Sequence, residues 1–297
     1  MELKLNNISK SYGKTKALSD FSMTFTSGIY ALLGPNGSGK STLMNIITDN
    51  LKADSGEILF DGENVKRMGV RFREKIGFMP QYPGLYPNFS AREFLCYMAS
   101  LKDIPKKQVK EAVETVLSAV ELSDVASQKI LSFSGGMKQR LALAQATLGE
   151  PEIIILDEPT AGLDPKQRIA VRNYISSIAL QKIVIIATHV VSDIEFIAKD
   201  AIILKKGVVI DNASPAVLTK TMENKVWSLQ CAESEVAEYE SRFRVTSIAK
   251  TDEGSVLLRV LFESKPTDDA TILAPTLEDY YLSKFGEFSV YKDIDYS

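Results

Sequence analysis

The sequence predicts an α/β fold with a mostly parallel sheet, an inserted helical subdomain and a small α+β domain at its end. Three observations predict this class. Apolar strands alternate with helices over residues 1–222, as in a parallel sheet covered by helices. Residues from about 85 to 150 interrupt this alternation with a helical pattern, and residues 223–297 change character again. With 297 residues, the chain is long enough for two domains.

The first strands are indicated by hydrophobic patterning. "ELKLNNI" and "FSMTFT" alternate apolar and polar residues, whereas "GIYALLG" is apolar throughout, as in a strand buried on both faces. This last run leads into Gly34 and a predicted helix, "STLMNIITD". "SGEILFDG" is predicted as another short strand between turn residues.

The helical block contains three predicted helices. "SAREFLCYMASL" and "PKKQVKEAVETVLSAVEL" have helical periodicity, and Pro105 is well placed at a helix start. The third helix opens at Ser134, and we expect it to be amphipathic, with Leu141, Ala144 and Leu148 on one face.

The alternation of strands and helices then returns. "EIIILDE" and "IVIIATH" are predicted strands, the helix "DPKQRIAVRNYISSIA" separates them, and "AIILKKGVVIDN" is a predicted hairpin. In the last domain, "KVWSLQC", "RVTSIAK" and "SVLLRVLFE" are predicted strands, and "SEVAEYESRF" and "TLEDYYLSKFG" are predicted helices.

Bulk composition excludes several classes of protein. The net charge of −3 argues against binding of duplex nucleic acid, which requires clustered positive charge. The two cysteines, Cys96 and Cys231, lie far apart without metal-ligand spacing, as in a reduced protein. No apolar run approaches the ~18–20 residues that span a bilayer, so we expect any membrane role to come from a partner.

A phosphate loop is predicted at residues 34–42, "GPNGSGKST". Its glycines allow backbone N–H groups to surround phosphates, Lys40 would reach the β/γ oxygens, and Ser41 would ligate Mg²⁺. The structural alternative is a glycine-rich turn before an ordinary helix. The loop follows a buried strand and precedes a helix, which is the context that a nucleoside triphosphate site requires.

Acidic and imidazole side chains follow two later strands. "IIILDEP" ends in Asp157, which would hold the metal through water, and Glu158, which would polarise the attacking water. Carboxylates at a strand end are often only loop charges, and a lone histidine is usually structural. His189, the only histidine, follows "IVIIAT" at the edge where α/β proteins bind ligands, so we expect it to orient the acid and the water.

Three further features are weaker when taken alone. Gln81, in "FMPQYPG", offers an uncharged amide for the metal or the water, and Tyr12 offers a ring that could stack on a purine. Ser134, followed by Gly135 and Gly136, opens a helix and so forms a second anion site.

Together these motifs resemble the nucleotide-binding subunit of an ATP-binding cassette (ABC) transporter, over roughly residues 1–220. In the family's order they correspond to the stacking aromatic, the Walker A loop, the Q-loop, the signature "FSGGM", the Walker B strand, the D-loop "AGLD" and the switch histidine. The resemblance implies a P-loop cassette with a mostly parallel core sheet, an antiparallel β subdomain and an inserted helical subdomain.

The resemblance also assigns site residues. The catalytic residues would be Glu158, His189, Lys40 and Gln81, and Mg²⁺ would be held by Ser41, Gln81 and Asp157. ATP would be bound by Tyr12, Gly34, Pro35, Asn36, Gly37, Ser38, Gly39, Lys40, Ser41, Thr42, Gln81, Ser134, Gly135, Gly136 and Asp164. Asp164 would signal across a dimer.

Family architecture implies that catalysis is shared between two cassettes. Two subunits, identical or paralogous, would pack head to tail, so that residues 134–136 of one bind the ATP held by Lys40 of the other. An integral membrane permease would be the second partner, at the cytoplasmic face of the membrane, with no nucleic acid involved. We expect it to dock near Gln81, on the stretch "QYPGLYPNF", although Tyr82, Tyr86 and Phe89 could equally pack the helical subdomain.

The signature departs from the usual LSGGQ at Phe133 and Met137 but keeps its Ser-Gly-Gly. "SGGMKQRL", "LYPNFSAREFL" and the terminal "LEDYYL" resemble the ABC-2-type exporter branch, which handles drugs, peptides and lantibiotics. The alternatives are an importer subunit of the same family and an ABC ATPase without a transport role.

Overall fold

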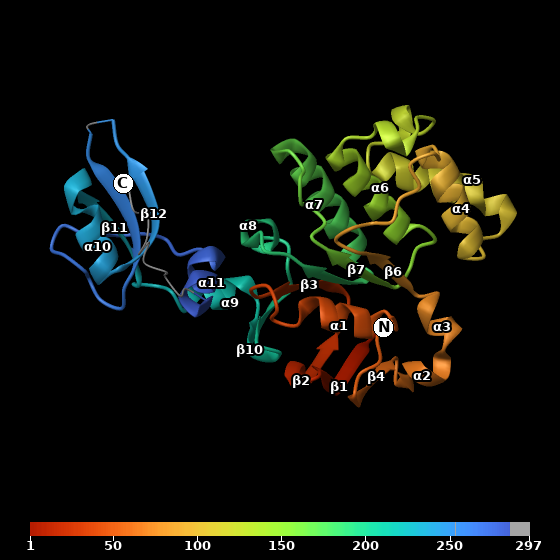
Figure 1. Ribbon diagram of the computed structural model, residues 1–297, viewed down its shortest axis with the longest axis horizontal. Helices are drawn as coiled ribbons and strands as arrows, with labels where there is room; N and C mark the ends of the chain where they lie inside the picture. The colour runs from red at the N-terminus through yellow and green to blue at the C-terminus, as the bar shows by residue number, and fades with distance from the viewer. Residues whose placement is uncertain (253, 286–297) are drawn as a thin grey trace. The chain divides into compact units, whose positions relative to one another are not determined.

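The computed structural model describes residues 1–252 and 254–285 (Figure 1). The chain folds into two compact units, the first over Met1–Asn212 and the second from Ala213 onward. The sequence placed this boundary after residue 222. The structure differs because α9 (Pro215–Lys220) packs against α11 (Leu277–Phe285), which lies in the second unit.

Two sheets form the first unit. One is antiparallel in the order β2-β1-β4-β5, and the other has the order β10-β9-β3-β8-β7-β6 with parallel pairing from β9 to β6. The mostly parallel core sheet is therefore confirmed. The strands are β1 (Leu3–Tyr12), β2 (Thr15–Phe25), β3 (Gly28–Leu33), β4 (Ser55–Phe60), β5 (Glu63–Asn64), β6 (Ile76–Met79), β7 (Ile153–Asp157), β8 (Ile183–Ala187), β9 (Asp200–Lys205) and β10 (Val208–Ala213).

Side-chain caps mark the starts of two helices in the first unit. Ser90 and Glu93 form a reciprocal capping box at the start of α4, and Asp164 caps α7 just before Pro165. The helices are α1 (Lys40–Ile47), α2 (Val65–Met68), α3 (Val70–Arg73), α4 (Ala91–Leu101), α5 (Lys106–Ala119), α6 (Gly135–Thr147), α7 (Pro165–Ala179) and α8 (Val191–Ile194), with 3₁₀ turns η1 (Ser123–Val125) and η2 (Ile130–Ser132).

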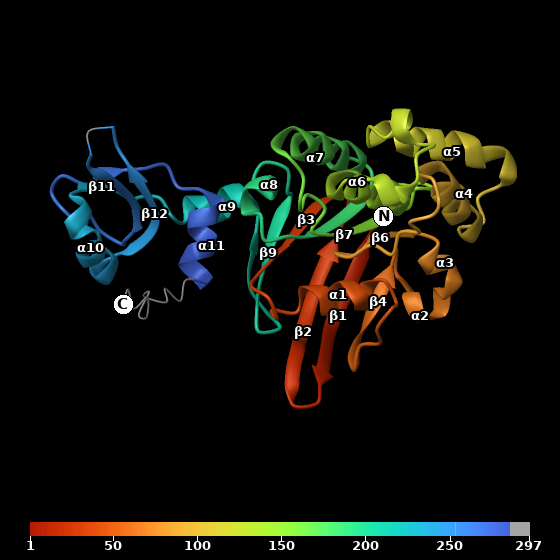
Figure 2. The same cartoon turned by 45° about the horizontal axis from the view of Figure 1, so that its top comes forward.

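A single hydrophobic cluster joins both sheets to α1. Leu43, Met44 and Ile47 of α1 are buried in it with Leu3 of the antiparallel sheet and Ile155 of the parallel sheet. Burial of this kind is the main stabilising contribution to a fold. It also holds α1 in place, and Figure 2 shows this helix beside the strands β1, β2 and β4.

Helix α6 is buried on most of its surface, so the expectation of a single apolar face is wrong. Leu141 and Ala144 are fully buried, but so are Ala142 and Leu143 on other sides of the helix, and Leu148 lies just beyond its end. The reason is packing: α6 contacts α4 and α5 within the helical subdomain and also β6 and β7 of the core sheet. A helix enclosed by neighbours carries apolar residues all round.

The second unit is a small α+β fold, as the sequence indicates. Its antiparallel sheet has the order β12-β13-β11-β14, and its core contains Leu229, Phe243, Val256, Leu258 and Val260. The elements are β11 (Val226–Cys231), β12 (Arg244–Lys250), β13 (Val256–Leu261), β14 (Thr271–Ile272), α9, α11, α10 (Val236–Arg242) and the 3₁₀ turn η3 (Glu233–Glu235).

Candidate nucleotide-binding site

The phosphate loop, residues 34–42, connects buried strand β3 to α1. Its last glycine, Gly39, caps α1 with a φ of +109°, and a Cβ there would lie 2.5 Å from the Ala17 carbonyl oxygen. Only glycine fits such a position without strain. The buried Ser38 hydroxyl has no hydrogen-bond partner among the described residues. A buried, unpartnered hydroxyl in a loop of this type suits a ligand oxygen.

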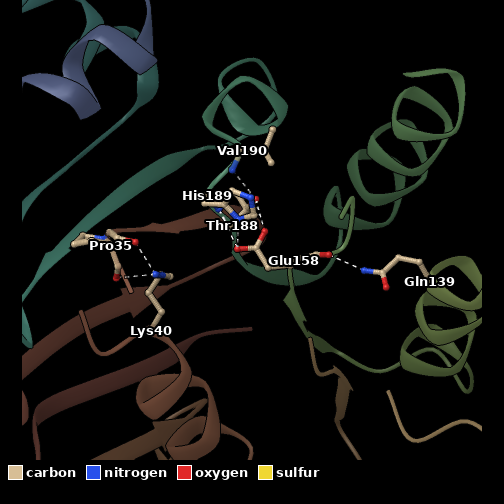
Figure 3. A network of polar contacts seen from close by, with 8 residues as sticks. Pro35, Lys40, Gln139, Glu158, Thr188, His189 and Val190 are labelled. Atoms are coloured by element: carbon tan, nitrogen blue, oxygen red, sulfur yellow. Dashed lines mark hydrogen bonds and ion pairs between the residues drawn. The ribbon is translucent and has the colours of Figure 1, made fainter. Parts of the chain in front are cut away.

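Lys40 turns its ammonium back onto the loop (Figure 3). Its Nζ donates to the carbonyl oxygens of Gly34 at 2.6 Å and Pro35 at 3.2 Å. Burial lowers the Lys40 pKa, while the charges of Glu158 and Asp157 oppose that shift. The ammonium is therefore held between backbone oxygens and carboxylates, where phosphate oxygens could replace the carbonyl partners.

Glu158 lies at the centre of a hydrogen-bonded network that links two strand ends. It follows β7, and its carboxylate accepts from the Thr188 hydroxyl at 3.0 Å and from the backbone N–H of His189 at 3.1 Å. The His189 Nδ1 lies 2.8 Å from the same carboxylate (Figure 3). Glu158 is buried, whereas the imidazole is largely exposed. The network fixes a carboxylate beneath an accessible ring.

The carboxylate of the adjacent Asp157 has a raised pKa. Burial raises its pKa, the Glu158 charge raises it further, and Lys40 opposes the shift. Two neighbouring carboxylates that are partly withdrawn from water favour a nearby cation. The structure thus brings Lys40, Asp157 and Glu158 into one electrostatic neighbourhood.

Elements behind His189 hold the strand end in place. Asp193 of α8 is buried and accepts from Arg168 of α7, with distances of 2.7 Å to Nη2 and 3.3 Å to Nε. A bidentate Arg–carboxylate pair is geometrically specific. It ties α8, which follows the histidine, to α7.

The signature turn, residues 134–136, forms the N-terminus of α6. The Ser134 hydroxyl caps the helix by accepting from the Met137 N–H at 3.3 Å. Ser134 and Gly135 are exposed, and Gly136 is buried. Free backbone N–H groups at such a helix start favour an anion.

The remaining predicted residues stand apart from the Glu158 network. Gln81 is exposed in the bend after β6, and Tyr12 is 53% exposed at the end of β1. Asp164 caps α7, accepting from the Gln167 N–H at 2.8 Å. Within residues 1–252 and 254–285, no hydrogen bond joins these three side chains to Glu158 or Lys40.

Two residues of the network were missed by the sequence analysis. Thr188 donates to Glu158 and accepts from the Val190 N–H at 3.0 Å, and Gln139 of α6 donates to the Glu158 carbonyl oxygen at 2.6 Å. A hydroxyl residue directly before His189, at the same strand end, is a signal that could have identified Thr188. Nothing in the local sequence points to Gln139.

A glycine-rich loop joins a central strand to a helix, and a carboxylate pair ends another strand of the same sheet. These two features define a P-loop nucleoside triphosphatase. Residues 18–161 match the family described as ABC transporter. The chain is 37% identical over 198 residues to the lantibiotic transport ATP-binding protein SrtF of Streptococcus pyogenes, a match that covers 66% of this chain and 83% of that protein.

The chain is also similar to a second ATP-binding protein and to a solved ATP-binding cassette. The chain is 34% identical over 221 residues to the linearmycin resistance ATP-binding protein LnrL of Bacillus subtilis (strain 168), covering 74% of this chain and 70% of that protein. It matches the solved dimeric structure of a post-hydrolysis state of the ATP-binding cassette MJ0796 bound to ADP and Pi. The TM-score is 0.66 at 29% identity, over 71% of this chain and 98% of that chain.

The chain therefore belongs to the family of ABC transporter ATP-binding proteins. It binds ATP and is an ATPase that hydrolyses ATP to ADP and phosphate, coupled to transport. Among the described residues, no helix is both long and apolar enough to cross a membrane.

Proposed function

We propose that two such cassettes, identical or paralogous, pack head to tail around two ATP molecules. The observation that carries this proposal is the signature turn, whose Ser134 and Gly135 face solvent at a helix N-terminus. The chain's own ATP would be held by the separate loop that carries Lys40. A second anion site then serves the nucleotide of the partner cassette. The dimeric form of the MJ0796 cassette supports this arrangement.

Within each composite site, catalysis is a matter of position and charge. Lys40 and the amides of residues 34–42 would neutralise the β/γ-phosphates, and Tyr12 would stack on the base. Glu158, fixed by Thr188 and His189, would polarise the attacking water. His189 would offer its remaining ring nitrogen to the γ-phosphate.

The residues at this site also fit Mg²⁺. The proposed donors are the hydroxyl of Ser41, the amide oxygen of Gln81 and the carboxylate of Asp157, all hard oxygen ligands of the kind Mg²⁺ prefers. Partial burial and the neighbouring Glu158 charge raise the pKa of the half-buried Asp157, and a nearby cation would offset both effects. When bound, the ion would add charge neutralisation at the β/γ-phosphates.

We infer that a membrane permease docks beside Gln81 and that the protein acts at the cytoplasmic face of the membrane. The Tyr86 ring lies 5.3 Å from that of Phe89 and 5.7 Å from that of Tyr97, so these aromatics pack together on the helical subdomain. Tyr82 is 85% exposed, and Tyr86 and Tyr97 are 45% and 40% exposed. Exposed aromatics of this kind favour a protein partner.

Export is the direction of transport we propose, with a drug, peptide or bacteriocin-like molecule as cargo and an ABC-2-type permease as partner. The names of two relatives, one for lantibiotic transport and one for linearmycin resistance, support this. Purification of the chain from native membranes should recover such a permease. Recovery of a permease together with a substrate-binding protein would instead indicate an importer.

Glu158→Gln tests the composite site. The variant should bind ATP, hydrolyse it about 10³-fold more slowly and run as a dimer in ATP, because the bridging nucleotide is no longer consumed. Glu150→Gln, which changes an exposed acid after α6, is the matched control and should behave as the unchanged protein. A Glu158→Gln protein that remains monomeric in saturating ATP would contradict the proposed dimer.

A further inference from the structure

Glu158 has an unusual backbone conformation. Its φ is +52°, in the left-handed region that side-chain-bearing residues rarely adopt. Such a conformation persists only where the surroundings hold it. Three hydrogen bonds do so here: the Glu158 N–H donates to the Ala187 carbonyl at 2.8 Å, and the Glu158 carbonyl accepts from the Gln139 amide at 2.6 Å and from the Ala161 N–H at 3.2 Å.

Gln139 makes its contact from a different part of the fold. It lies on α6, and its side chain is buried with a relative exposure of 9%. The partner is a carbonyl oxygen, which only accepts, so the amide nitrogen must face it. Figure 3 shows Gln139 approaching Glu158 from α6, whereas Lys40 turns toward Pro35. The backbone of the proposed general base is therefore held by the end of β8, through Ala187, and by α6, through Gln139.

The same helix begins with the signature turn. Gln139 follows Ser134 by five positions, which at the usual helical rise is about 7.5 Å along the axis. The helix is hydrogen-bonded between them, because the Lys138 N–H donates to the Ser134 carbonyl at 3.0 Å. A hydrogen-bonded helix moves as a unit over so short a length. A shift at the start of α6 would therefore reach Gln139.

We propose that Gln139 is a positioning residue that couples the signature turn of a cassette to the general base of that same cassette. The inference rests on the proposed function, in which residues 134–136 bind the ATP held by the partner. When that ATP is seated, α6 is fixed, and Gln139 holds the Glu158 backbone so that its carboxylate meets the water. Each cassette thus becomes competent when the opposite site is filled, and hydrolysis is cooperative in ATP.

Gln139→Met tests this role because it keeps the length of the side chain and removes the donor. We expect kcat to fall about tenfold, the effect of one lost hydrogen bond at a buried site, with KM for ATP unchanged. The Hill coefficient for ATP should fall from about 2 toward about 1. Gln145→Met on the same helix is the matched control: Gln145 is half-buried and no described hydrogen bond joins its side chain to Glu158, so kcat should stay within about twofold.

Gln139→Glu provides a second test, because its pH profile would match that of the unchanged protein if Gln139 only supported the fold. An ionised carboxylate would repel the Glu158 carbonyl, whereas a protonated carboxyl could donate to it. Burial raises the pKa of a carboxyl, so activity relative to the unchanged protein should be higher at about pH 6 than at about pH 8. This comparison is made within one folded variant, so it remains informative if Gln139→Met is unstable.

The outcomes separate the two proposals. If Glu158→Gln forms the ATP-bound dimer but Gln139→Met keeps its kcat and Hill coefficient, the positioning role is wrong. Equal losses in Gln139→Met and Gln145→Met, or a pH profile of Gln139→Glu parallel to that of the unchanged protein, would also overturn it. If Glu158→Gln stays monomeric in ATP, the dimer itself fails, whatever the Gln139 variants do.

Discussion

The N-termini of α1 and α6 both follow glycine-rich turns, but they are built differently. At α1 the turn is enclosed by the chain itself: Gly39 has no room for a side chain because of the Ala17 carbonyl, and Ser38 is only 2% exposed. No side chain caps this helix. The first-turn N–H groups are thus held ready by packing and left for a ligand.

At α6 the turn has an ordinary conformation and an open outer side. Ser134 is extended, with φ −63° and ψ 166°, and its hydroxyl caps the helix. A Cβ on Gly135 would meet no described atom within 4 Å. The turn before α1 is thus enclosed by this chain's own core, whereas the turn before α6 is open to solvent, as a site shared with a second cassette would be.

The largest effect is expected when two inactive variants, one at each turn, are mixed. Lys40→Met should abolish the first site and Ser134→Phe the second, and each protein alone should lose about 10³-fold in ATPase activity, the scale of a lost charge stabiliser. In a 1:1 mixture, half of the dimers are mixed, and each contains one intact composite site, so the mixture should form an ATP-dependent dimer that neither variant forms alone. Because coupling through Gln139 requires the opposite site to be filled, the ATPase activity of the mixture should stay well below a quarter of full activity. A mixture that forms no ATP-dependent dimer would contradict shared sites.

Alanine substitutions of one glycine in each turn should affect stability differently. Gly39→Ala should destabilise the protein by about 2 kcal/mol and prevent ATP binding, because both the backbone conformation and the space exclude a methyl group. Gly135→Ala should leave thermal stability and binding of ATP to the phosphate loop unchanged while weakening the ATP-induced dimer. Thermal melts and nucleotide titrations distinguish the two. Equal destabilisation by both substitutions would remove the distinction between the turns.

Thr188→Val probes the network on the side of the phosphate loop. The substitution keeps the shape of a fully buried side chain and removes the hydroxyl that donates to Glu158 and accepts from the Val190 N–H. We expect kcat to fall about threefold to tenfold with little change in KM. Thr188→Ser, which retains the hydroxyl, should recover most of the loss; a Ser variant as impaired as the Val variant would show that packing alone matters.

The smallest expected effect is that of Asp157→Asn on the thermal stability of the nucleotide-free protein, which this substitution should increase. Burial and Glu158 raise the folded pKa of Asp157 above its unfolded value, so the ionised form is disfavoured by folding at neutral pH. The neutral amide should therefore raise the melting temperature at pH 7, with the gain shrinking as the pH falls below the pKa of Asp157. An unchanged or lower melting temperature would contradict the assigned electrostatics.

Much of the parallel sheet could be predicted because its signals are local. Continuous apolar runs such as β3 and β8 are buried on both faces, and hydrophobic periodicity detects them directly. Helix α6 could not be predicted in the same way. Its environment is set by four separate neighbours, α4, α5, β6 and β7, which no pattern within its own residues reveals.

The chemistry of the site was determined by the sequence: a glycine-rich loop with Lys40, a carboxylate pair and one histidine need fixed residue types at fixed spacing, because short stretches of backbone bind phosphate. Tertiary structure alone decided how Glu158 is held. Thr188 and Gln139 lie 30 and 19 positions away along the chain, and only the order of the strands and the packing of α6 bring them to it. Contacts of that kind depend on side chains meeting in space, and the spacing of residues along a chain does not specify them.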